Sequence, residues 1–492
     1  MTEAATMILF GATGDLAKRK LFPALYSLFQ ENQLPQQFAV VGVGRRTLSR
    51  EAFQTHVKSS IESFARYSVN EKWPDFISRF YYVSLDIQEL GDYQTLLHTI
   101  KTVEHDYSIP QNRLFYLAIA PELFEPVTFH LQQSGILRQR GWKRVVIEKP
   151  FGHDLPSAEA LNKEISQVFT EEEIYRIDHY LGKEMVQNIE VIRFANTLFE
   201  PVWNNQYISN VQITSSEVVG VEGRAGYYDQ AGALRDMVQN HMLQMMTMVA
   251  MEPPSRLKPE AVRDEKVKVL RSIRRLHQAD EIARHVVRGQ YVAGEINGEV
   301  MKGYREEEKV NPNSQTETFV ALKFHIDNFR WAGVPFYIRT GKRLAKKATE
   351  VIIQFKQLPP LYFNQSGQLD PNVLVIRIYP ENGLHLKLNL RQPDNMDKIA
   401  PVSMSFTQNG SPGFHSPEAY ERLVKDCIEG NSTYFTRWDE VALAWKIVDP
   451  IVQAFETGEV PLYTYKAGSW GPAEADQLVA QEGLKWWPVL GQ

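Results

Sequence analysis

The chain has 492 residues, of which 43% are hydrophobic, and its formal net charge is −5. This length can supply large buried cores and suggests about three domains. Because acidic and basic residues are mixed and no long basic run occurs, the charge gives no reason to expect nucleic acid as a partner. A small anionic ligand needs only a local cluster of cations and stays compatible with these numbers.

The chain contains a single cysteine, Cys427, which excludes an internal disulfide and a cysteine-rich zinc site. Its helix-like surroundings are typical of a small apolar residue rather than a catalytic thiol. The N-terminal segment lacks the basic start and apolar core of a signal peptide, and no run reaches the ~20 apolar residues of a membrane span. We therefore expect a cytoplasmic protein with no membrane partner.

The first third of the chain alternates between short apolar runs and helical patterns. Strand–helix–strand alternation predicts parallel pairing in a doubly wound α/β sheet. The expected strands are Met7–Phe10, Phe38–Val43, Phe80–Leu85, Leu114–Ile119 and Val145–Glu148, with Ile174–Asp178 as a further candidate. The expected helices include Leu16–Phe29 and Ala158–Phe169.

The later part of the chain contains longer strands of alternating polarity. They are Val211–Val221, Thr318–Ile326, Val351–Lys356, Val373–Tyr379 and Leu384–Leu390. In the last of these, leucine alternates with polar residues, which predicts a strand with one buried face. Asn382-Gly383 is a hairpin signal, and the polar residues 302–316 predict a mobile surface loop. We expect a large, mostly antiparallel sheet with helices.

The first strong motif is the turn Gly11-Ala12-Thr13-Gly14, which follows the first expected strand and precedes a helix beginning near Asp15. Glycines let backbone N–H groups approach a pyrophosphate, and a helix N-terminus adds positive partial charge. The spacing is Gly-x-x-Gly rather than Gly-x-Gly-x-x-Gly, so an ordinary strand–helix turn stays an alternative. Its place at the first strand–helix junction favours dinucleotide binding.

The second expected strand ends in Arg45 and Arg46, with no acidic residue beside them. NAD enzymes usually place Asp or Glu at this point to bind the ribose 2′-hydroxyl, whereas arginine accommodates a 2′-phosphate. Unless both arginines are merely solvated, this pattern predicts NADP rather than NAD.

Two further segments present lysines near expected strand ends. Lys149 stands at the carboxyl end of a parallel strand, where ligands bind in open α/β sheets, and Pro150 after it admits a cis peptide bond. Lys342 and Lys347 lie in the basic segment Tyr337–Lys347 and are candidates for phosphate contacts. Solvated lysines would explain both patterns equally well.

The densest cluster of polar residues is Arg176–Asn188. If this segment is helical, His179 and Lys183 share one face, where two cations can hold a phosphate dianion, while Asp178 points elsewhere. A helix-capping aspartate followed by exposed charges is the alternative.

The segment Gly232–Met251 predicts a buried helix in which His241 is the polar exception on an apolar stripe. That stripe consists of Leu234, Met237, Val238, His241, Met245 and Met248. A histidine with its hydrogen bonds satisfied in the core and a general base would both produce this pattern. Asp236 lies roughly 140° from His241 around a regular helix, so both reach one ligand only near the helix N-terminus.

Seven segments together resemble the glucose-6-phosphate dehydrogenase family. They are GATGDLAKRKL, EKPFG, RIDHYLGKEMVQN, the Glu217 strand, RAGYYDQAGALRDMVQNHMLQ, GVPFYIRTGKRL and YKAGSWGP, and they cover essentially the whole chain. The resemblance implies a Rossmann domain over residues 1–178 and an α+β domain over residues 179–492. It also implies oxidation of glucose 6-phosphate with NADP, and assembly as a homodimer or homotetramer.

The resemblance assigns roles to individual residues. It implies that His241 is the general base and that Asp178 orients it, with no metal. The implied substrate-binding residues are Lys20, Lys149, His179, Tyr180, Lys183, Glu217, Asp236, Lys342 and Lys347. The implied cofactor-binding residues are Gly11, Ala12, Thr13, Gly14, Asp15, Leu16, Arg45, Asp86, Ile87 and Lys149.

Three other functions stay open from the sequence. One is an NADP-dependent dehydrogenase of another sugar phosphate, and the second is a non-catalytic dinucleotide sensor that regulates a partner. The third is a metalloenzyme using Asp178, His179 and His241, although adjacent aspartate and histidine are poor ligands for one metal.

Overall fold

The computed structural model describes residues 3–138, 140–359, 361, 369–392, 395–408 and 417–489, without the side chains of 395–398. The chain forms two compact units. The first consists of Met1–Gly182, Arg256–Arg263 and Pro417–Ala442, and the second of Lys183–Ser255, Asp264–Ser416 and Leu443–Gln492. The expected domain boundary between residues 178 and 179 stays a prediction.

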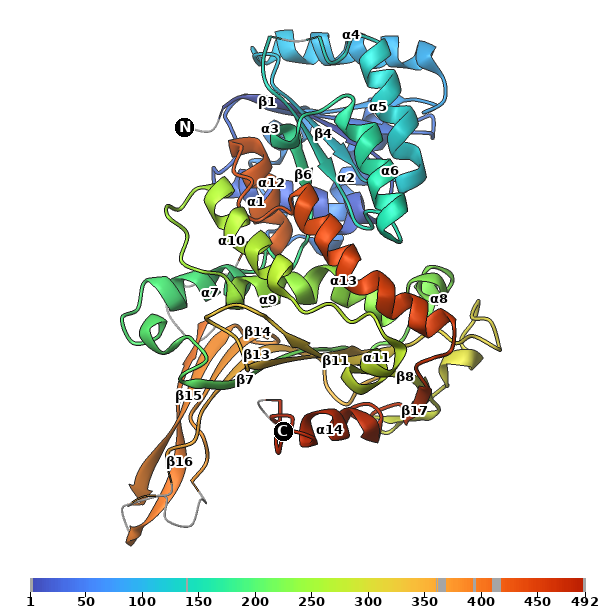
Figure 1. Ribbon diagram of the computed structural model, residues 1–492. Helices are drawn as coiled ribbons and strands as arrows, with labels where there is room; N and C mark the ends of the chain where they lie inside the picture. Colours follow the sequence, from blue (N-terminus) through green and yellow to red (C-terminus); the bar gives the residue numbers. More distant parts are fainter. Residues whose placement is uncertain are drawn as a thin grey trace. The chain divides into compact units, whose positions relative to one another are not determined.

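The first unit is built on a six-stranded parallel sheet with the order β3-β2-β1-β4-β5-β6 (Figure 1). Its strands are β1 (Ala5–Phe10), β2 (Phe38–Gly44), β3 (Phe80–Ser84), β4 (Arg113–Leu117), β5 (Lys143–Ile147) and β6 (Ile174–Arg176). This order is that of a Rossmann fold and confirms the doubly wound sheet. The strand order reverses between β1 and β4, and ligands bind at such a point, beyond the carboxyl ends of the strands.

Apolar cores lie on both faces of this sheet, since side chains of successive strand residues point to opposite faces. Met7 and Leu9 of β1 belong to one core, and Ile8 and Phe10 belong to the other. The first core includes residues of α1 (Phe22–Gln30), α2 (Arg50–Phe64), α3 (Trp73–Ser78) and α12 (Ala419–Glu429). The second includes residues of α4 (Leu90–Asp106), α5 (Phe124–Gln133) and α6 (Leu155–Ser166).

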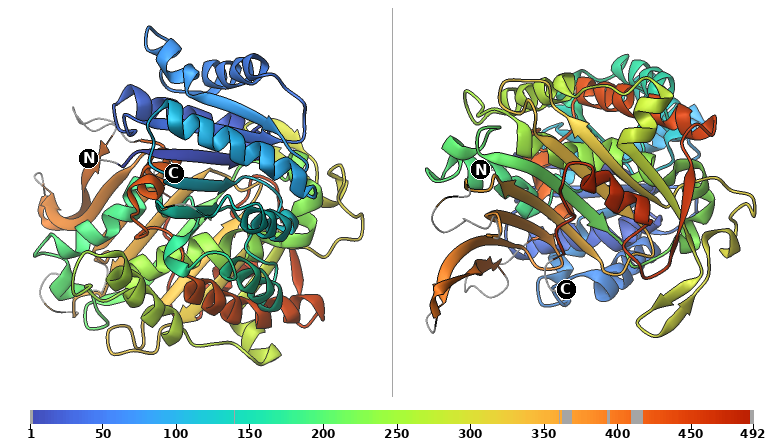
Figure 2. Two further views of the ribbon diagram at one scale, coloured as in Figure 1. Left: turned by 90° about the horizontal axis from the view of Figure 1, so that it is seen from above. Right: turned by 60° about the horizontal axis from the view of Figure 1, so that its bottom comes forward.

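The second unit is built on a nine-stranded sheet with the order β16-β15-β14-β13-β7-β12-β11-β8-β17. Figure 2 shows two further views of the ribbon, in which the strands of residues 373–407 can be followed by their orange colour. Its strands are β7 (Ile208–Ser216), β8 (Val286–Val292), β11 (Phe319–His325), β12 (Pro335–Gly341), β13 (Ala348–Phe355), β14 (Val373–Tyr379), β15 (Gly383–Gln392), β16 (Asn395–Thr407) and β17 (Leu462–Lys466). Only β7–β12 and β8–β17 pair in parallel among these strands, which confirms the mostly antiparallel sheet. A separate hairpin joins β9 (Gly294–Ile296) and β10 (Glu299–Met301).

The remaining α-helices of the described chain are α7 (Glu184–Phe194), α8 (Ala225–Ala233), α9 (Leu243–Ala250), α10 (Pro259–Ser272), α11 (Ala279–His285), α13 (Trp438–Glu456) and α14 (Ala473–Ala480). None of the helices in the described ranges combines the length and apolar character that a bilayer crossing requires.

The leucine face of β15 is less buried than its alternation predicted. Leu390 is 57% exposed, and the other three leucines are only partly buried. On β16, which pairs with β15, Val402, Met404 and Phe406 are exposed and lie opposite these leucines. Opposite residues of an antiparallel pair share a face. They form a surface called here the β15–β16 apolar row, which consists of Leu384, Leu386, Leu388, Leu390, Val402, Met404 and Phe406.

The segment 302–316, which was expected to be a mobile surface loop, is partly buried. It contains a short helical turn, Tyr304–Glu306, in which Tyr304 is fully buried. The hydroxyls of Tyr304 and Ser314 donate hydrogen bonds to Asp229, at 2.8 and 2.5 Å. The buried Tyr304 and the carboxylate of Asp229 therefore anchor the segment to the rest of the second unit.

Candidate functional site

The residues implied to bind the cofactor lie along the carboxyl edge of the parallel sheet in the first unit. Gly11 directly follows β1, Arg45 directly follows β2, and Asp86 comes just after β3. Lys149 follows β5 by two positions, and its peptide bond to Pro150 is cis. Because parallel strands end at the same edge, the fold gathers residues that lie far apart in the sequence.

The Gly11–Gly14 segment forms the expected turn. Gly11 has φ of 80°, and a Cβ atom there would lie 2.2 Å from the Ala118 carbonyl oxygen. The Gly14 N–H donates to the Gly11 carbonyl at 2.9 Å. The Lys18 N–H donates to the Gly14 carbonyl at 3.1 Å, which is the first hydrogen bond of the helix. The N–H groups of residues 15–17 come before it and are not used within the helix. These are the donors that a helix N-terminus offers to a phosphate.

Replacing Gly11 with valine is expected to disrupt this turn. A left-handed backbone costs a residue with a side chain about 1–2 kcal/mol, and the clash with Ala118 adds about 1–3 kcal/mol. The variant should melt at a lower temperature and bind NADP weakly, as measured by calorimetry and fluorescence titration. Gly91→Ala is the matched control, because nothing lies within 4 Å of its added Cβ atom. Unchanged NADP affinity in Gly11→Val would contradict the assignment.

The helix that follows this turn is irregular. A π-helical segment, η1 (Ala17–Leu21), precedes α1, so the expected continuous helix Leu16–Phe29 is not regular throughout. The Lys20 ammonium forms an ion pair with Glu418 at 2.9 Å, and the two side chains are 43% and 60% exposed. Such an exposed pair contributes little to stability, so Lys20 can exchange Glu418 for another anion.

The end of β2 carries a local excess of positive charge. Arg45 and Arg46 are both exposed, and the Tyr82 hydroxyl donates to the Arg46 carbonyl at 2.7 Å. Burial lowers the pKa of His56, and the charges of Lys18 and Arg46 lower it further. A 2′-phosphate placed directly after β2 would lie in this positive potential.

A buried carboxyl group precedes Lys149. Glu148 accepts a hydrogen bond from the Tyr116 hydroxyl at 2.6 Å and interacts with Tyr420. Burial raises the pKa of Glu148 in spite of these hydrogen bonds. Tyr116 of β4 and Tyr420 of α12 therefore hold Glu148, the residue directly before Lys149, in place.

The segment after β6 forms a turn rather than the helix considered for Arg176–Asn188. The Asp178 carboxylate accepts the Tyr180 N–H at 2.9 Å, and the Asp178 carbonyl accepts the Leu181 N–H at 3.0 Å. Helix α7 begins only at Glu184, and Lys183 has extended backbone angles. The expectation that His179 and Lys183 share a helical face is therefore wrong. The Asp178 side chain satisfies the backbone locally and competes with helix formation.

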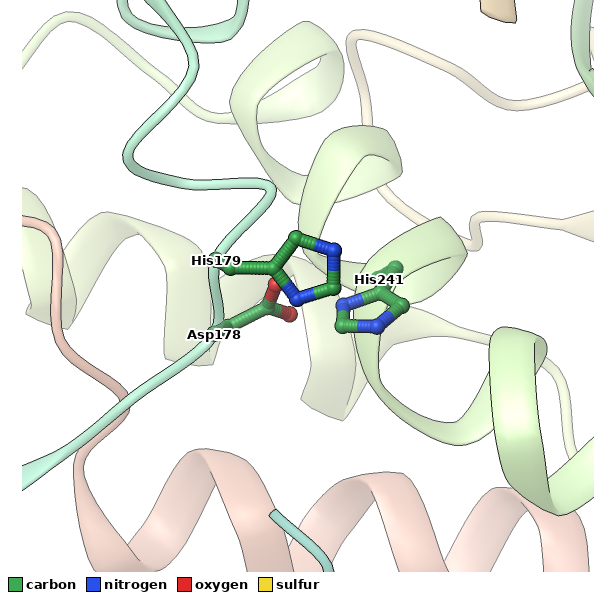
Figure 3. Close-up of side chains that lie close together, drawn as sticks. All are labelled: Asp178, His179 and His241. Atoms are coloured by element: carbon green, nitrogen blue, oxygen red, sulfur yellow. The ribbon is translucent and has the colours of Figure 1, made fainter. Parts of the chain in front are cut away.

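Helix η6 (Leu234–Met242) carries His241 and Asp236 and is π-helical, not the regular helix expected. Figure 3 draws His241 on this helix, and Asp178 and His179 on the segment after β6. The Asn240 side chain accepts the His241 N–H at 2.7 Å and donates to the Arg235 carbonyl at 3.2 Å. The Asn240 side chain thus takes part in the backbone hydrogen bonding of this π-helical segment.

The π-helix brings Asp236 and His241 closer in angle than a regular helix would. The Leu243 N–H donates to the Val238 carbonyl, five residues earlier. Residues five apart in such a helix lie nearly above one another, as residues four apart do in an α-helix. Asp236 and His241 are both buried. The predicted separation of about 140° is therefore wrong, and the difficulty of reaching one ligand from both disappears.

Two residues implied to bind the substrate form an ion pair in the second unit. The Lys342 ammonium lies 2.5 Å from the Glu217 carboxylate. The parallel pairing of β7 with β12 sets this contact, because Ser216 lies opposite Gly341 and the two residues follow directly. The Lys342 ammonium also lies 5.0 Å from the ring centroid of Tyr228. Lys347 is exposed and packs over Tyr379 at 4.3 Å.

Sequence reasoning missed three residues that surround Asp236. Burial, together with the charge of the nearby Asp236, raises the pKa of Tyr227 to about 12. The Arg224 guanidinium lies 3.9 Å from the same carboxylate. Burial raises the pKa of Tyr228 well above its ordinary value, and the charges of Asp236 and Glu217 raise it further. The aromatic pair in RAGYYDQ was the available signal.

Comparison with known families identifies the chain. A model of the glucose-6-phosphate dehydrogenase NAD-binding domain matches residues 8–188, and a model of the C-terminal domain matches residues 190–487. The chain belongs to the glucose-6-phosphate dehydrogenase family.

Members of the glucose-6-phosphate dehydrogenase family match the chain over its whole length. Glucose-6-phosphate 1-dehydrogenase of Bacillus subtilis is 52% identical, over 99% of this chain and 98% of the relative. The enzyme of Treponema pallidum is 44% identical, over 98% of this chain and 94% of the relative. A solved glucose-6-phosphate dehydrogenase in complex with its substrate glucose-6-phosphate has a TM-score of 0.91 at 35% identity and 99% coverage of both chains. The Mycobacterium avium enzyme has a TM-score of 0.86 at 33% identity, with both chains fully covered.

Proposed function

We propose that the chain oxidises glucose 6-phosphate at C1 to 6-phosphoglucono-δ-lactone, with hydride transfer to NADP. This reaction is the first oxidative step of the pentose phosphate pathway. The observation that carries the proposal is the 52% identity, over 99% of this chain, to a curated glucose-6-phosphate 1-dehydrogenase.

The residues along the carboxyl edge of the parallel sheet suit an NADP molecule. NADP, when bound, supplies the nicotinamide ring that accepts the hydride. The Gly11–Gly14 turn and the helix N-terminus after it provide backbone donors for the pyrophosphate, and Arg45 provides a cation for the 2′-phosphate. The full set assigned to the cofactor is Gly11, Ala12, Thr13, Gly14, Asp15, Leu16, Arg45, Asp86, Ile87 and Lys149.

Basic residues hold the sugar phosphate, and carboxylates hold the sugar. We assign the phosphate to His179, Tyr180 and Lys183, because positively charged side chains bind a phosphate dianion strongly and the Tyr180 hydroxyl can add a neutral donor. Glu217 and Asp236 accept hydrogen bonds from sugar hydroxyls. The Glu217–Lys342 ion pair offers an acceptor and a donor side by side. Lys20, Lys149 and Lys347 complete the set.

His241 is assigned as the general base. Its imidazole removes the proton of the C1 hydroxyl as the hydride leaves C1. Asp178 holds the imidazole in the required tautomer and stabilises the imidazolium that forms. Both side chains are buried, at 1% and 3% exposure. Burial strengthens the electrostatic effect of the carboxylate, because the local dielectric constant is low.

Turnover measurements with purified protein test the proposal. NADPH formation is followed by absorbance with glucose 6-phosphate and, separately, with galactose 6-phosphate and mannose 6-phosphate. We expect glucose 6-phosphate to give the highest kcat/KM and chelator to leave the rate unchanged. Faster turnover of another sugar phosphate would replace the substrate assignment. NADP binding without turnover would favour the sensor function, and loss of activity in chelator would favour a metalloenzyme.

Replacing Arg45 with serine is expected to weaken the preference for NADP. A charge-assisted hydrogen bond to a phosphate contributes about 1.5–3 kcal/mol, which solvent reduces at an exposed side chain. The KM for NADP should therefore rise about tenfold while the KM for NAD stays unchanged. Arg275→Ser, at another exposed arginine, is the control. An equal change in both KM values would show that Arg45 does not read the 2′-phosphate.

We propose a homodimer formed through the β15–β16 apolar row, with a homotetramer as the larger possibility. The row exposes a continuous apolar surface, as interfaces between subunits do. Met404→Asp should convert the assembly to monomers in analytical ultracentrifugation. Ser403→Asp, at the adjacent position facing the other side of the sheet, should not. Assembly of Met404→Asp like the unaltered chain would place the interface elsewhere.

We also infer a cytoplasmic setting. Cys427 is fully buried on α12, and burial raises the pKa of its thiol well above the ordinary value. A chain with one inert thiol gains nothing from an oxidising compartment. Cell fractionation followed by activity measurement would check this inference.

A further inference from the structure

A cavity of about 280 Å³ lies in the second unit, at the start of helix η6. None of the residues assigned to glucose 6-phosphate or NADP lines it. Its lining includes Leu234 of η6, Arg288 of β8, Glu317 before β11 and Phe455 of α13. This volume is near the lower limit of ~300–1,000 Å³ for small-molecule sites, so a dinucleotide does not fit.

Arg288 presents unused hydrogen-bond donors to this cavity. Its side chain is only 4% exposed, and its Nε donates to the Val460 carbonyl at 2.9 Å. The guanidinium carbon lies 4.8 Å from the ring centroid of Phe455. Within the described residues, the two terminal nitrogens have no hydrogen-bond acceptor on the protein. Because Arg288 lines the cavity and its terminal nitrogens are not among the fully buried atoms, these donors are available to a charged ligand there.

Glu317 lines the same cavity and supports the start of helix η6. Its side chain is 6% exposed, its carboxylate accepts the Leu234 N–H at 2.9 Å, and its carbonyl accepts the Ala233 N–H at 3.0 Å. Gly232, with φ of 66°, permits this approach, because a Cβ atom there would lie 2.3 Å from Glu317 Oε1. Among the described residues, Glu317 and Arg288 form no direct ion pair. A buried cation and a buried acid therefore line one cavity, and the charge of each favours the charged form of the other without a direct contact.

The other charged groups of the lining are already engaged. Arg235 forms an ion pair with Glu456 at 2.9 Å, and Asp229 accepts hydrogen bonds from Tyr304 and Ser314. A simple anion would be repelled by the carboxylates of the lining, and a simple cation by the guanidinium groups. A ligand that carries both charges satisfies both sides.

We propose that this cavity binds a small zwitterion of the α-amino acid class, with its carboxylate on Arg288 and its ammonium on Glu317. The planar guanidinium can grip the carboxylate with two parallel hydrogen bonds. The ammonium reaches a carboxyl group that also accepts the Leu234 N–H at the first residue of η6, the helix that carries Asp236 and His241. Occupancy therefore bears on the helix of the assigned base, although binding itself does not depend on the proposed function.

Binding is tested on the full-length protein by titration calorimetry and thermal shift, with L-alanine as the zwitterion. Acetate and methylammonium each carry one of its two charges and serve as separate probes. We expect L-alanine to bind and to raise the melting temperature, and each single-charge probe to bind at least tenfold more weakly. No turnover is measured, so this result is independent of the dehydrogenase assay.

Two variants locate the bound amino acid. Arg288→Lys keeps the charge but loses the bidentate geometry, and it should bind L-alanine at least tenfold more weakly. Val452→Phe fills the cavity without altering a charge and should abolish binding, which keeps the test valid if Arg288→Lys misfolds. Arg284→Lys, at an exposed arginine on α11, is the control and should bind as the unaltered chain does.

Hydrogen exchange gives an independent readout at the start of η6. L-alanine should slow exchange of the Ala233 and Leu234 amides several-fold in the unaltered chain and have no effect in Val452→Phe. Absence of L-alanine binding to the unaltered chain would overturn the proposal. Equal binding to Val452→Phe, or binding of acetate as tight as that of L-alanine, would overturn it as well.

Discussion

Replacing His241 with asparagine is expected to lower kcat about 10²–10⁴-fold, the usual contribution of a positioned general base. The KM for glucose 6-phosphate should change little, because the residues assigned to the phosphate and the sugar are untouched. Steady-state kinetics with NADP, together with a melting curve to verify folding, measure the effect.

His277→Asn is the control for this measurement, since His277 is exposed. It should keep the kcat of the unaltered chain. If His241→Asn keeps more than about half of kcat, His241 does not act as the base.

Replacing Asp178 with asparagine is expected to lower kcat by a similar factor, about 10²–10⁴-fold. The asparagine carbonyl can still accept the Tyr180 N–H, so the turn after β6 should persist. The variant loses only the negative charge that orients and stabilises the imidazole. Steady-state kinetics measure the loss, and Asp75→Asn, at an exposed aspartate, is the control.

The double variant His241→Asn, Asp178→Asn shows whether the two residues act together on kcat or contribute to it independently. If Asp178 acts through His241, the double variant should be about as slow as His241→Asn alone, because the carboxylate then has nothing to orient. A kcat reduced by the product of the two single effects would show that Asp178 acts on another group.

The strands of the parallel sheet were predictable because their signals are local. Short apolar runs bounded by turns located all six strands of this sheet. In the nine-stranded sheet, Val373–Tyr379 was predicted with the same bounds that β14 has. The edge that gathers Gly11, Arg45 and Lys149 follows from that sheet, because every parallel strand ends there. The Glu217–Lys342 pair did not follow from spacing, since it depends on the register between β7 and β12.

The features that sequence reasoning missed depend on single side chains or on surroundings. In the turn after β6 the Asp178 carboxylate accepts a backbone N–H, and in the π-helix the Asn240 side chain accepts another. Helical periodicity assumes a regular α-helix, so it could predict neither the turn after β6 nor the π-helix. The exposure of the β15–β16 apolar row depends on what covers it, which alternation alone does not specify. Polar composition around residues 302–316 concealed the buried Tyr304.

The wide turn of η6 makes the number of residues between Asp236 and His241 matter in one direction more than in the other. Deleting one residue between them would let the segment tighten to an α-helix, in which residues four apart share a face, so the acid and the imidazole would stay on one side. Inserting one residue would place them six apart and turn them toward different faces of the helix. The next helix, α9, is buried along its whole length, so it holds the end of this segment in place. We therefore expect a single insertion in this stretch to lower activity far more than a single deletion.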